Sequence, residues 1–215
     1  MSNKYRYPNE VDDFLTKQLV KRKREIIELK LLLDTYIKKK HNISKVLAKS
    51  LIVISYSHWE GYVKESVIAY LTYLNFKNIK FSELNDNYKA SFIHSNLFCK
   101  KLKPAKAIEE MATILSEDRT ITSFPIDYIC DCESNLNYEI FEKILWRIGL
   151  SQNTWIDYQN FLDSKILKNR NDFAHGDDNI VIESDALVIA DKVIIMMSQF
   201  NNELSNQMNT KGYLK

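Results

Sequence analysis

One ten-residue segment, residues 168–177, carries the side chains best suited to acid–base and phosphate chemistry. It reads KNRNDFAHGD and places Arg170, Asn171, Asp172 and His175 close together in sequence at the end of a predicted helix. A histidine has an ordinary pKa of about 6.5 and can take up or release a proton near neutral pH. An arginine stays charged and can hold a phosphate through several N–H groups. These residue types could therefore act together on one phosphate.

Helical spacing limits how these four side chains can meet. Residues four apart on a helix are neighbours, whereas residues five apart are separated by about 140° around the axis. Asn171 and Asp172 can therefore lie beside His175, while Arg170 points elsewhere. Two copies of the helix that face each other across a two-fold axis would each supply a histidine and an arginine to a shared cleft. The spacing favours a homodimer, and a distorted helix end within one chain is the alternative.

The same residues are also typical of an ordinary helix terminus. Gly176 suits the left-handed position that commonly ends a helix, and His175 would interact favourably with the negative end of the helix dipole. The spacing by itself favours this structural interpretation over a catalytic one.

Hydrophobic residues recur at helical spacing along most of the chain and predict an all-α helical bundle of long antiparallel helices with additional short ones. The second long helix is apolar on more than one face, which is typical of a central helix. Only 4 glycines and 3 prolines are present, too few for turn-rich β folds or glycine-rich phosphate loops. We expect helices over residues 9–40, 43–76, 86–98, 104–115, 138–150, 153–175 and from Ser184 onward.

The length and composition favour a single domain over residues 1–215. With 45% hydrophobic residues, the chain can bury a core without disulfides or metal ions. Residues 77–137 are less regular than the rest, and much of the stretch 117–137 has no clean period. We interpret residues 77–137 as a variable insertion between core helices.

Cysteine usage and the apolar runs predict a cytoplasmic location with no membrane contact. The three cysteines are Cys99, Cys130 and Cys132, and the close pair is C-x-C rather than the C-x-x-C common in zinc and redox sites. The first residues lack the apolar stretch of a signal peptide, and the most apolar run, residues 51–56, is too short to span a bilayer.

Basic residues concentrate in the first long helix although the net charge is only +2. Between residues 17 and 49, lysines and arginines greatly outnumber acids, and Lys21, Arg22 and Arg24 are our candidates for contacting RNA. The alternative, a solvated helix face, is the better interpretation in the absence of other observations. The remaining histidines have no ligand-like spacing, so we expect no metal site and no cofactor.

Two separate segments resemble the HEPN superfamily of proteins. Residues 170–176 resemble its R-x4–6-H signature, including the polar residue that commonly follows the arginine. Residues 57–64 (SHWEGYVK) resemble the hWEg segment on an early central helix of the RiboL-PSP HEPN group. The two matches occur in the expected order, which makes them more specific together than apart. The resemblance covers most of the chain outside residues 77–137.

The resemblance implies a four-to-five-helix bundle that dimerises and cleaves RNA without a metal ion, often as a toxin or antiviral defence effector. His175 would be the general base or acid, and Arg170 would hold the scissile phosphate. The expected products are a 2′,3′-cyclic phosphate and a 5′-hydroxyl. Asn171 would orient the imidazole or contact the substrate, and Asp172 would raise the pKa of His175. The implied partners are RNA, a second copy sharing the site, and an antitoxin or defence-system protein.

Other interpretations stay open at this point. Glu60 could pair with Arg170 or face the cleft, and a structural salt bridge or hydrogen bond is as good an interpretation. Asp177 stands where some HEPN toxins carry a tyrosine that a partner enzyme modifies, which argues against silencing by that route. The chain could also be a non-catalytic HEPN-like dimerisation or adaptor module, or a protein that binds RNA without cleaving it.

Overall fold

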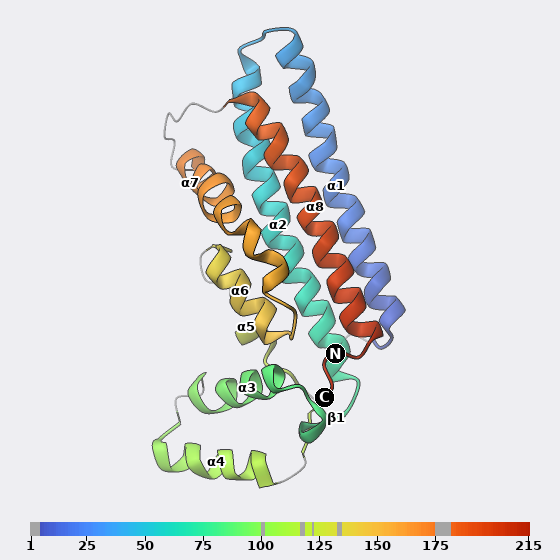
Figure 1. Cartoon of the computed structure of the whole chain (residues 1–215), viewed down its shortest axis with the longest axis vertical. Helices are drawn as coiled ribbons and strands as arrows, with labels where there is room; N and C mark the ends of the chain where they lie inside the picture. Colours follow the sequence, from blue (N-terminus) through green and yellow to red (C-terminus); the bar gives the residue numbers. More distant parts are fainter. Residues whose placement is uncertain (1–4, 100–101, 117–118, 122, 133–134, 175–181) are drawn as a thin grey trace.

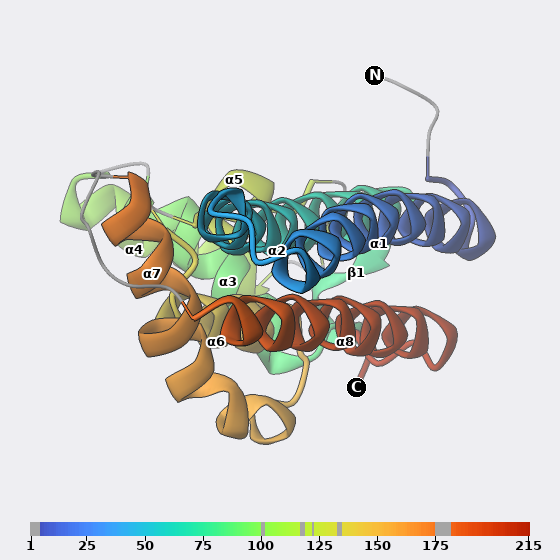
Figure 2. The same cartoon turned by 90° about the horizontal axis from the view of Figure 1, so that it is seen from above.

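Three long helices form the body of the molecule. The computed structural model describes residues 5–99, 102–116, 119–121, 123–132, 135–174 and 182–215. Helices α1 (Pro8–Lys38), α2 (Ile43–Asn75) and α8 (Glu183–Asn209) lie side by side along the long axis (Figure 1). The view from above shows α1 and α2 in one layer with α8 packed against both (Figure 2).

Side-chain contacts establish the relative directions of these helices. Ser44, at the start of α2, donates a 2.9 Å hydrogen bond to Glu183 at the start of α8, so α2 and α8 run parallel. Ser205, near the end of α8, donates a 2.6 Å bond to Asp12 near the start of α1, so these two run antiparallel. The predicted antiparallel arrangement thus holds for α1 against both neighbours, while α2 and α8 run parallel to each other. The reason is that the chain between them runs back along the bundle before α8 begins (Figure 1).

Shorter elements cover one side and one end of this body. The described helices between α2 and α8 include 3₁₀ segments η1 and η3 and π-helical segments η2 and η4, and a two-residue strand pair joins β1 to β2 in antiparallel register. In order these are β1 (Ile79–Lys80), η1 (Phe81–Glu83), α3 (Asp86–His94), η2 (Ser95–Cys99), α4 (Pro104–Ser116), β2 (Thr120–Ile121), α5 (Ile126–Ile129), α6 (Tyr138–Arg147), η3 (Asn153–Tyr158), η4 (Phe161–Leu167) and α7 (Lys168–Ala174). The prediction of an all-α fold is confirmed.

Helix α2 is central, as its apolar character predicted. Trp59 has no exposed surface. Its ring packs edge-on against Phe141 of α6, with centroids 5.0 Å apart, and lies 5.9 Å from Trp155 of η3 and 6.2 Å from Phe200 of α8. A single residue of α2 therefore holds three other elements in one aromatic core.

The end of α6 has a physical cause that is visible in the sequence. Gly149 has φ +71°, a left-handed conformation that other residues seldom adopt. Its N–H donates to the carbonyl of Trp146 at 3.0 Å, and the N–H of Leu150 donates to that of Leu145 at 2.9 Å. This bond pair is a Schellman motif, and it confirms the predicted helix end.

The start of α8 differs slightly from the prediction. Ser184 was expected to cap this helix, but the helix begins at Glu183 and Ile182 occupies the N-cap position. A hydrogen bond from its own backbone N–H, and then the bond from Ser44, lower the pKa of the Glu183 carboxyl. This carboxylate satisfies one of the N–H groups that have no partner within the helix, and its negative charge is favourable at the helix N-terminus.

The elements from β1 to β2 lie at one end of the bundle, with α3 and α4 beyond the end of α2, whereas α5 lies beside α6 (Figure 1). Tyr88 anchors the segment 77–137: its buried hydroxyl is 2.7 Å from that of Tyr70 on α2 and donates to the carbonyl of Ile148. The N–H of Phe124 also donates to Asn75 at 2.6 Å. The interpretation of this segment as a variable insertion in a single domain stays a prediction.

None of the helices in the described parts of the chain has the length and apolar character needed to cross a bilayer.

Candidate functional site

The helical stretch that leads to Arg170 changes its winding along its length. The sequence predicts one regular helix from Asn153, but the chain is 3₁₀ through η3, π-helical through η4 and α-helical only in α7. Stretches of π-helix often occur at functional sites. The described part of α7 ends at Ala174, so the predicted catalytic His175 lies outside the described residues. Asp177 does too.

Arg170 is held in a defined position by two amides and an aromatic ring. Its Nη1 donates to Oδ1 of Asn135 at 3.0 Å and to Oδ1 of Asn171 at 2.8 Å. Its Cζ lies 5.2 Å from the centroid of the Tyr56 ring, which is close enough for a cation–π interaction. The side chain is therefore fixed although it is only partly buried.

Tyr56 connects the arginine to the central helix and to Glu60. The Tyr56 side chain is buried, and its hydroxyl accepts a 2.8 Å hydrogen bond from the backbone N–H of Leu136. Burial raises the pKa of this hydroxyl well above its usual range, and its hydrogen bond to Glu60 and the charge of that carboxylate raise it further. Glu60 therefore reaches Arg170 through Tyr56, and within the described residues the two form no direct ion pair.

Asn171 and Asp172, the other predicted members of the site, lie on different sides of α7. Asn171 accepts from Arg170 and so positions the arginine, a contact that the sequence did not suggest. Asp172 is half-buried and lines a cavity between α7 and α8. Both residues were predicted to act on His175, which lies outside the described part of the chain. These two roles therefore stay predictions.

The arrangement leaves Arg170 suited to binding an anion. Its two hydrogen-bond partners are neutral amides, so the positive charge is not cancelled by either of them. A guanidinium carries five N–H donors, and those on Nε and Nη2 form a planar fork that matches a phosphate. A fixed and partly exposed cation of this kind can bind a phosphate without first losing side-chain freedom.

The three predicted RNA-binding residues of α1 do not share one environment. Lys21 and Arg24 are exposed, and Arg24 pairs with Glu28 at 2.7 Å. Arg22 is only 8% exposed, and its Nη2 lies 3.0 Å from a carboxylate oxygen of Glu65 on α2. Consecutive helix residues point about 100° apart, so the three side chains point in different directions, and Arg22 is the one that faces α2. The structure thus places Arg22 inside the bundle, where it is not available to contact RNA.

Gly61 explains how Arg22 fits against α2. A Cβ atom at this position would lie 3.3 Å from Nη2 of Arg22, tighter than most real contacts. Gly61 is five residues from Tyr56, which places it about 140° away around α2. The basic residues of α1 and the Arg170 site therefore lie on opposite sides of α2, as the positions of α1 and α7 also show (Figure 1).

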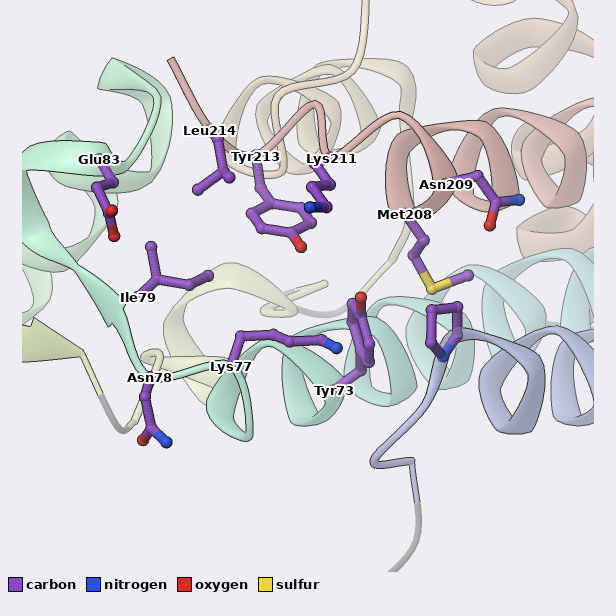
Figure 3. A pocket seen from close by; sticks show the side chains of 11 residues that line it. Tyr73, Lys77, Asn78, Ile79, Glu83, Met208, Asn209, Lys211, Tyr213 and Leu214 are labelled. Atoms are coloured by element: carbon purple, nitrogen blue, oxygen red, sulfur yellow. The ribbon is translucent and has the colours of Figure 1, made fainter.

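A second cavity lies far from this site. It measures about 390 Å³ and is found where α2 and α8 end, with Tyr73, Lys77 and Lys211 among its lining residues (Figure 3). Tyr73 and Tyr56 are 17 residues apart on α2, about 25 Å along its axis. Lys77 extends over the Tyr73 ring at 4.5 Å, and both lysines follow helix C-termini, where a cation stabilises the helix dipole. These lysines therefore have a structural explanation.

Cys130 and Cys132 do not form a reactive centre. Burial raises the pKa of the Cys130 thiol to about 12 and that of Cys132 to about 11, so both remain protonated near neutral pH. Within the described residues, no three histidine, cysteine or acidic side chains are grouped to hold a metal ion. A metal-independent reaction stays a prediction.

Sequence analysis missed two residues of the arginine site, Tyr56 and Asn135. Tyr56 precedes Glu60 by four positions and so shares its helix face, a signal that could have been used. Asn135 lies in the stretch without a clean period, and nothing local marks it.

The all-helical bundle is the architecture that the HEPN resemblance predicted. A sequence profile of the RiboL-PSP-HEPN family matches residues 17–206, which is most of the chain. The chain belongs to the RiboL-PSP-HEPN family. No curated protein and no solved structure matches it.

Proposed function

We propose that this chain is a metal-independent endoribonuclease. The observation that carries the proposal is the position of Arg170. In a member of the RiboL-PSP-HEPN family, the arginine of the segment resembling the R-x4–6-H signature is fixed on Tyr56 by Asn135 and Asn171, with its charge left uncancelled by those amides.

The proposed reaction uses the ribose 2′-hydroxyl as the nucleophile. His175 takes the proton from that hydroxyl, and the 2′ oxygen forms a bond to the adjacent phosphorus. The bond from phosphorus to the 5′ oxygen breaks, and this oxygen leaves with a proton from a general acid. Arg170 binds the phosphate oxygens and stabilises the added charge of the five-coordinate state. The products are a 2′,3′-cyclic phosphate and a 5′-hydroxyl, and Asp172 supports the charged form of His175.

The proposal includes a homodimer with a shared site, in which each copy supplies His175 to the arginine of the other. Lys21 and Arg24 stay candidates for RNA contact, because both are exposed. Since they lie across α2 from Arg170 in one chain, they would serve a strand that extends beyond the site or that reaches it from the second copy. The biological setting we propose is a toxin or antiviral effector that acts in the cytoplasm, held in check by an antitoxin or another defence-system protein.

Cleavage of RNA in the presence of EDTA is the direct test. The purified protein is expected to cut a labelled single-stranded RNA and to leave 2′,3′-cyclic phosphate ends, which mass spectrometry identifies. His175→Ala is expected to reduce the rate by about 10²–10⁴-fold, because it removes the group that exchanges the proton.

Two results would contradict the ribonuclease proposal: intact RNA after incubation with the wild-type protein, or equal cleavage by His175→Ala. Salt-sensitive binding of RNA that stays intact would support an RNA-binding module instead. Dimerisation without RNA binding would support an adaptor.

Tyr56 offers a second test, because its ring and its hydroxyl have separate functions. Tyr56→Leu removes the ring beneath Arg170 and is expected to lower kcat about fivefold, which corresponds to roughly 1 kcal/mol of cation–π stabilisation. Tyr56→Phe keeps the ring but leaves the buried N–H of Leu136 without its acceptor. We expect it to retain most of the rate and to lower the free energy of unfolding by about 1–3 kcal/mol.

Tyr73→Leu is the matched control, since Tyr73 is a buried tyrosine of the same helix far from Arg170. If Tyr56→Leu and Tyr73→Leu lower kcat equally at matched stability, Tyr56 has no role in positioning the arginine.

A further inference from the structure

A cavity of about 590 Å³ lies between the segment that carries Arg170 and the start of α8. One wall comes from η4 and α7 and the other from α8, with one residue of α2 at the base. Its lining residues are Ile52, Phe161, Ser164, Lys165, Lys168, Asn169, Asp172, Ile182, Asp185, Val188, Ile189 and Lys192.

Three lysines give this cavity a cationic rim. Lys165 and Lys168 are exposed, and both line the cavity. Lys192 comes from α8, and its Nζ lies 4.6 Å from the ring centroid of Phe161. The cavity has two carboxylates, Asp172 and Asp185, so the ammonium groups are in excess and favour an anionic ligand.

The floor of the cavity is apolar. Ile182 is 58% exposed and Val188 is 64% exposed, next to the buried side chains of Phe161 and Ile189. Exposed aliphatic side chains beside lysines suit a ligand with a flat apolar part and a phosphate. A nucleotide has both, since a base can pack on apolar surface while its phosphate meets the lysines.

The cavity is next to Arg170 but on a different face of α7. Arg170 and Lys168 are two residues apart, about 3 Å along the helix axis. Arg170 turns toward Asn135 and Tyr56, whereas Lys168 and Asp172 turn toward α8. Residues two apart on a helix point about 160° apart around the axis, so a strand bound at Arg170 passes around α7 before one of its nucleotides reaches the cavity.

We propose that this cavity binds one nucleotide of a single-stranded RNA, on the other side of α7 from the phosphate that Arg170 holds. Lys165 and Lys168 contact its phosphate, and Ile182 and Val188 contact its base. The inference rests on the proposed ribonuclease function for its choice of RNA, but binding at the cavity can be measured without cleavage.

Binding of an RNA in which every 2′-hydroxyl is methylated tests the proposal, because such an RNA cannot be cleaved by 2′-hydroxyl attack. Fluorescence anisotropy at several salt concentrations gives Kd and its salt dependence. The double variant Lys165→Ala with Lys168→Ala is expected to bind several-fold more weakly, with the slope of log Kd against log salt reduced by about 0.7 for each lost phosphate contact. Val188→Ser is expected to weaken binding without changing that slope.

The matched control is Lys103→Ala with Lys106→Ala, two exposed lysines at and just before the start of α4, away from α7 (Figure 1). It is expected to bind like the wild type. Circular dichroism confirms that each variant is folded. A lysine variant with wild-type Kd and slope would overturn the proposal, and so would a wild-type protein that does not bind the methylated RNA. If the Lys165→Ala with Lys168→Ala variant binds more weakly but the wild-type protein cleaves no unmodified RNA, the nucleotide site in the cavity is supported and the ribonuclease proposal fails.

Discussion

Arg170→Ala is expected to lower kcat for RNA cleavage by about 10²–10³-fold, the usual effect of removing one donor that stabilises a charged transition state. The side chain is partly exposed and its partners Asn135 and Asn171 are neutral amides that water can satisfy, so the variant should remain folded. Single-turnover cleavage in EDTA, with thermal unfolding measured in parallel, checks both statements.

Arg170→Lys is the informative comparison. It keeps the charge but loses the planar guanidinium, whose Nη1 bonds two amides and whose face lies over Tyr56, so an intermediate rate is expected. A wild-type rate in Arg170→Ala would show that another cation holds the phosphate.

Mixing subunits then tests whether the site is shared. Arg170→Ala and His175→Ala are each expected to be nearly inactive alone. In a mixed dimer, the histidine of one copy would face the arginine of the other, and this restores one of two sites. With half of the dimers mixed, about a quarter of the wild-type rate returns. No recovery after subunit exchange would mean that each site is built within one chain or that the protein is not a dimer.

Trp59→Ala is expected to destabilise the fold by about 3–5 kcal/mol, which is a large part of the stability of a typical domain. The indole is fully buried and touches aromatic rings from three other elements, so its removal leaves a cavity that helices cannot easily close. Denaturant unfolding followed by circular dichroism measures the change.

Trp146→Ala is its matched control, because this tryptophan is 43% exposed. A surface substitution of this kind is expected to change stability by about 0.5 kcal/mol or less. Equal effects of the two substitutions would contradict the central position of Trp59. The expected result would also mean that the tryptophan of the hWEg segment serves the fold.

The sequence by itself determined the long helices and the family. The apolar spacing of α1, α2 and α8, the all-round apolar character of α2 and the glycine that ends α6 are local properties, readable because helices follow a period of 3.6 residues. The two short motifs predicted the family that the profile match confirms. The sequence also identified both Arg170 and Asn171 as candidate site residues, because they are adjacent in the segment that resembles the HEPN signature.

Only the tertiary structure decided what surrounds the arginine. Asn135 is 35 positions from Arg170, and Leu136 is 80 positions from Tyr56, so no local pattern links them. The burial of Arg22 could not be predicted from the sequence either. A basic side chain on a long helix faces either solvent or a neighbouring helix, and the packing of the helices decides which. Periodicity reports what each residue does within its own helix, whereas the site depends on contacts between segments that meet only when the bundle has formed.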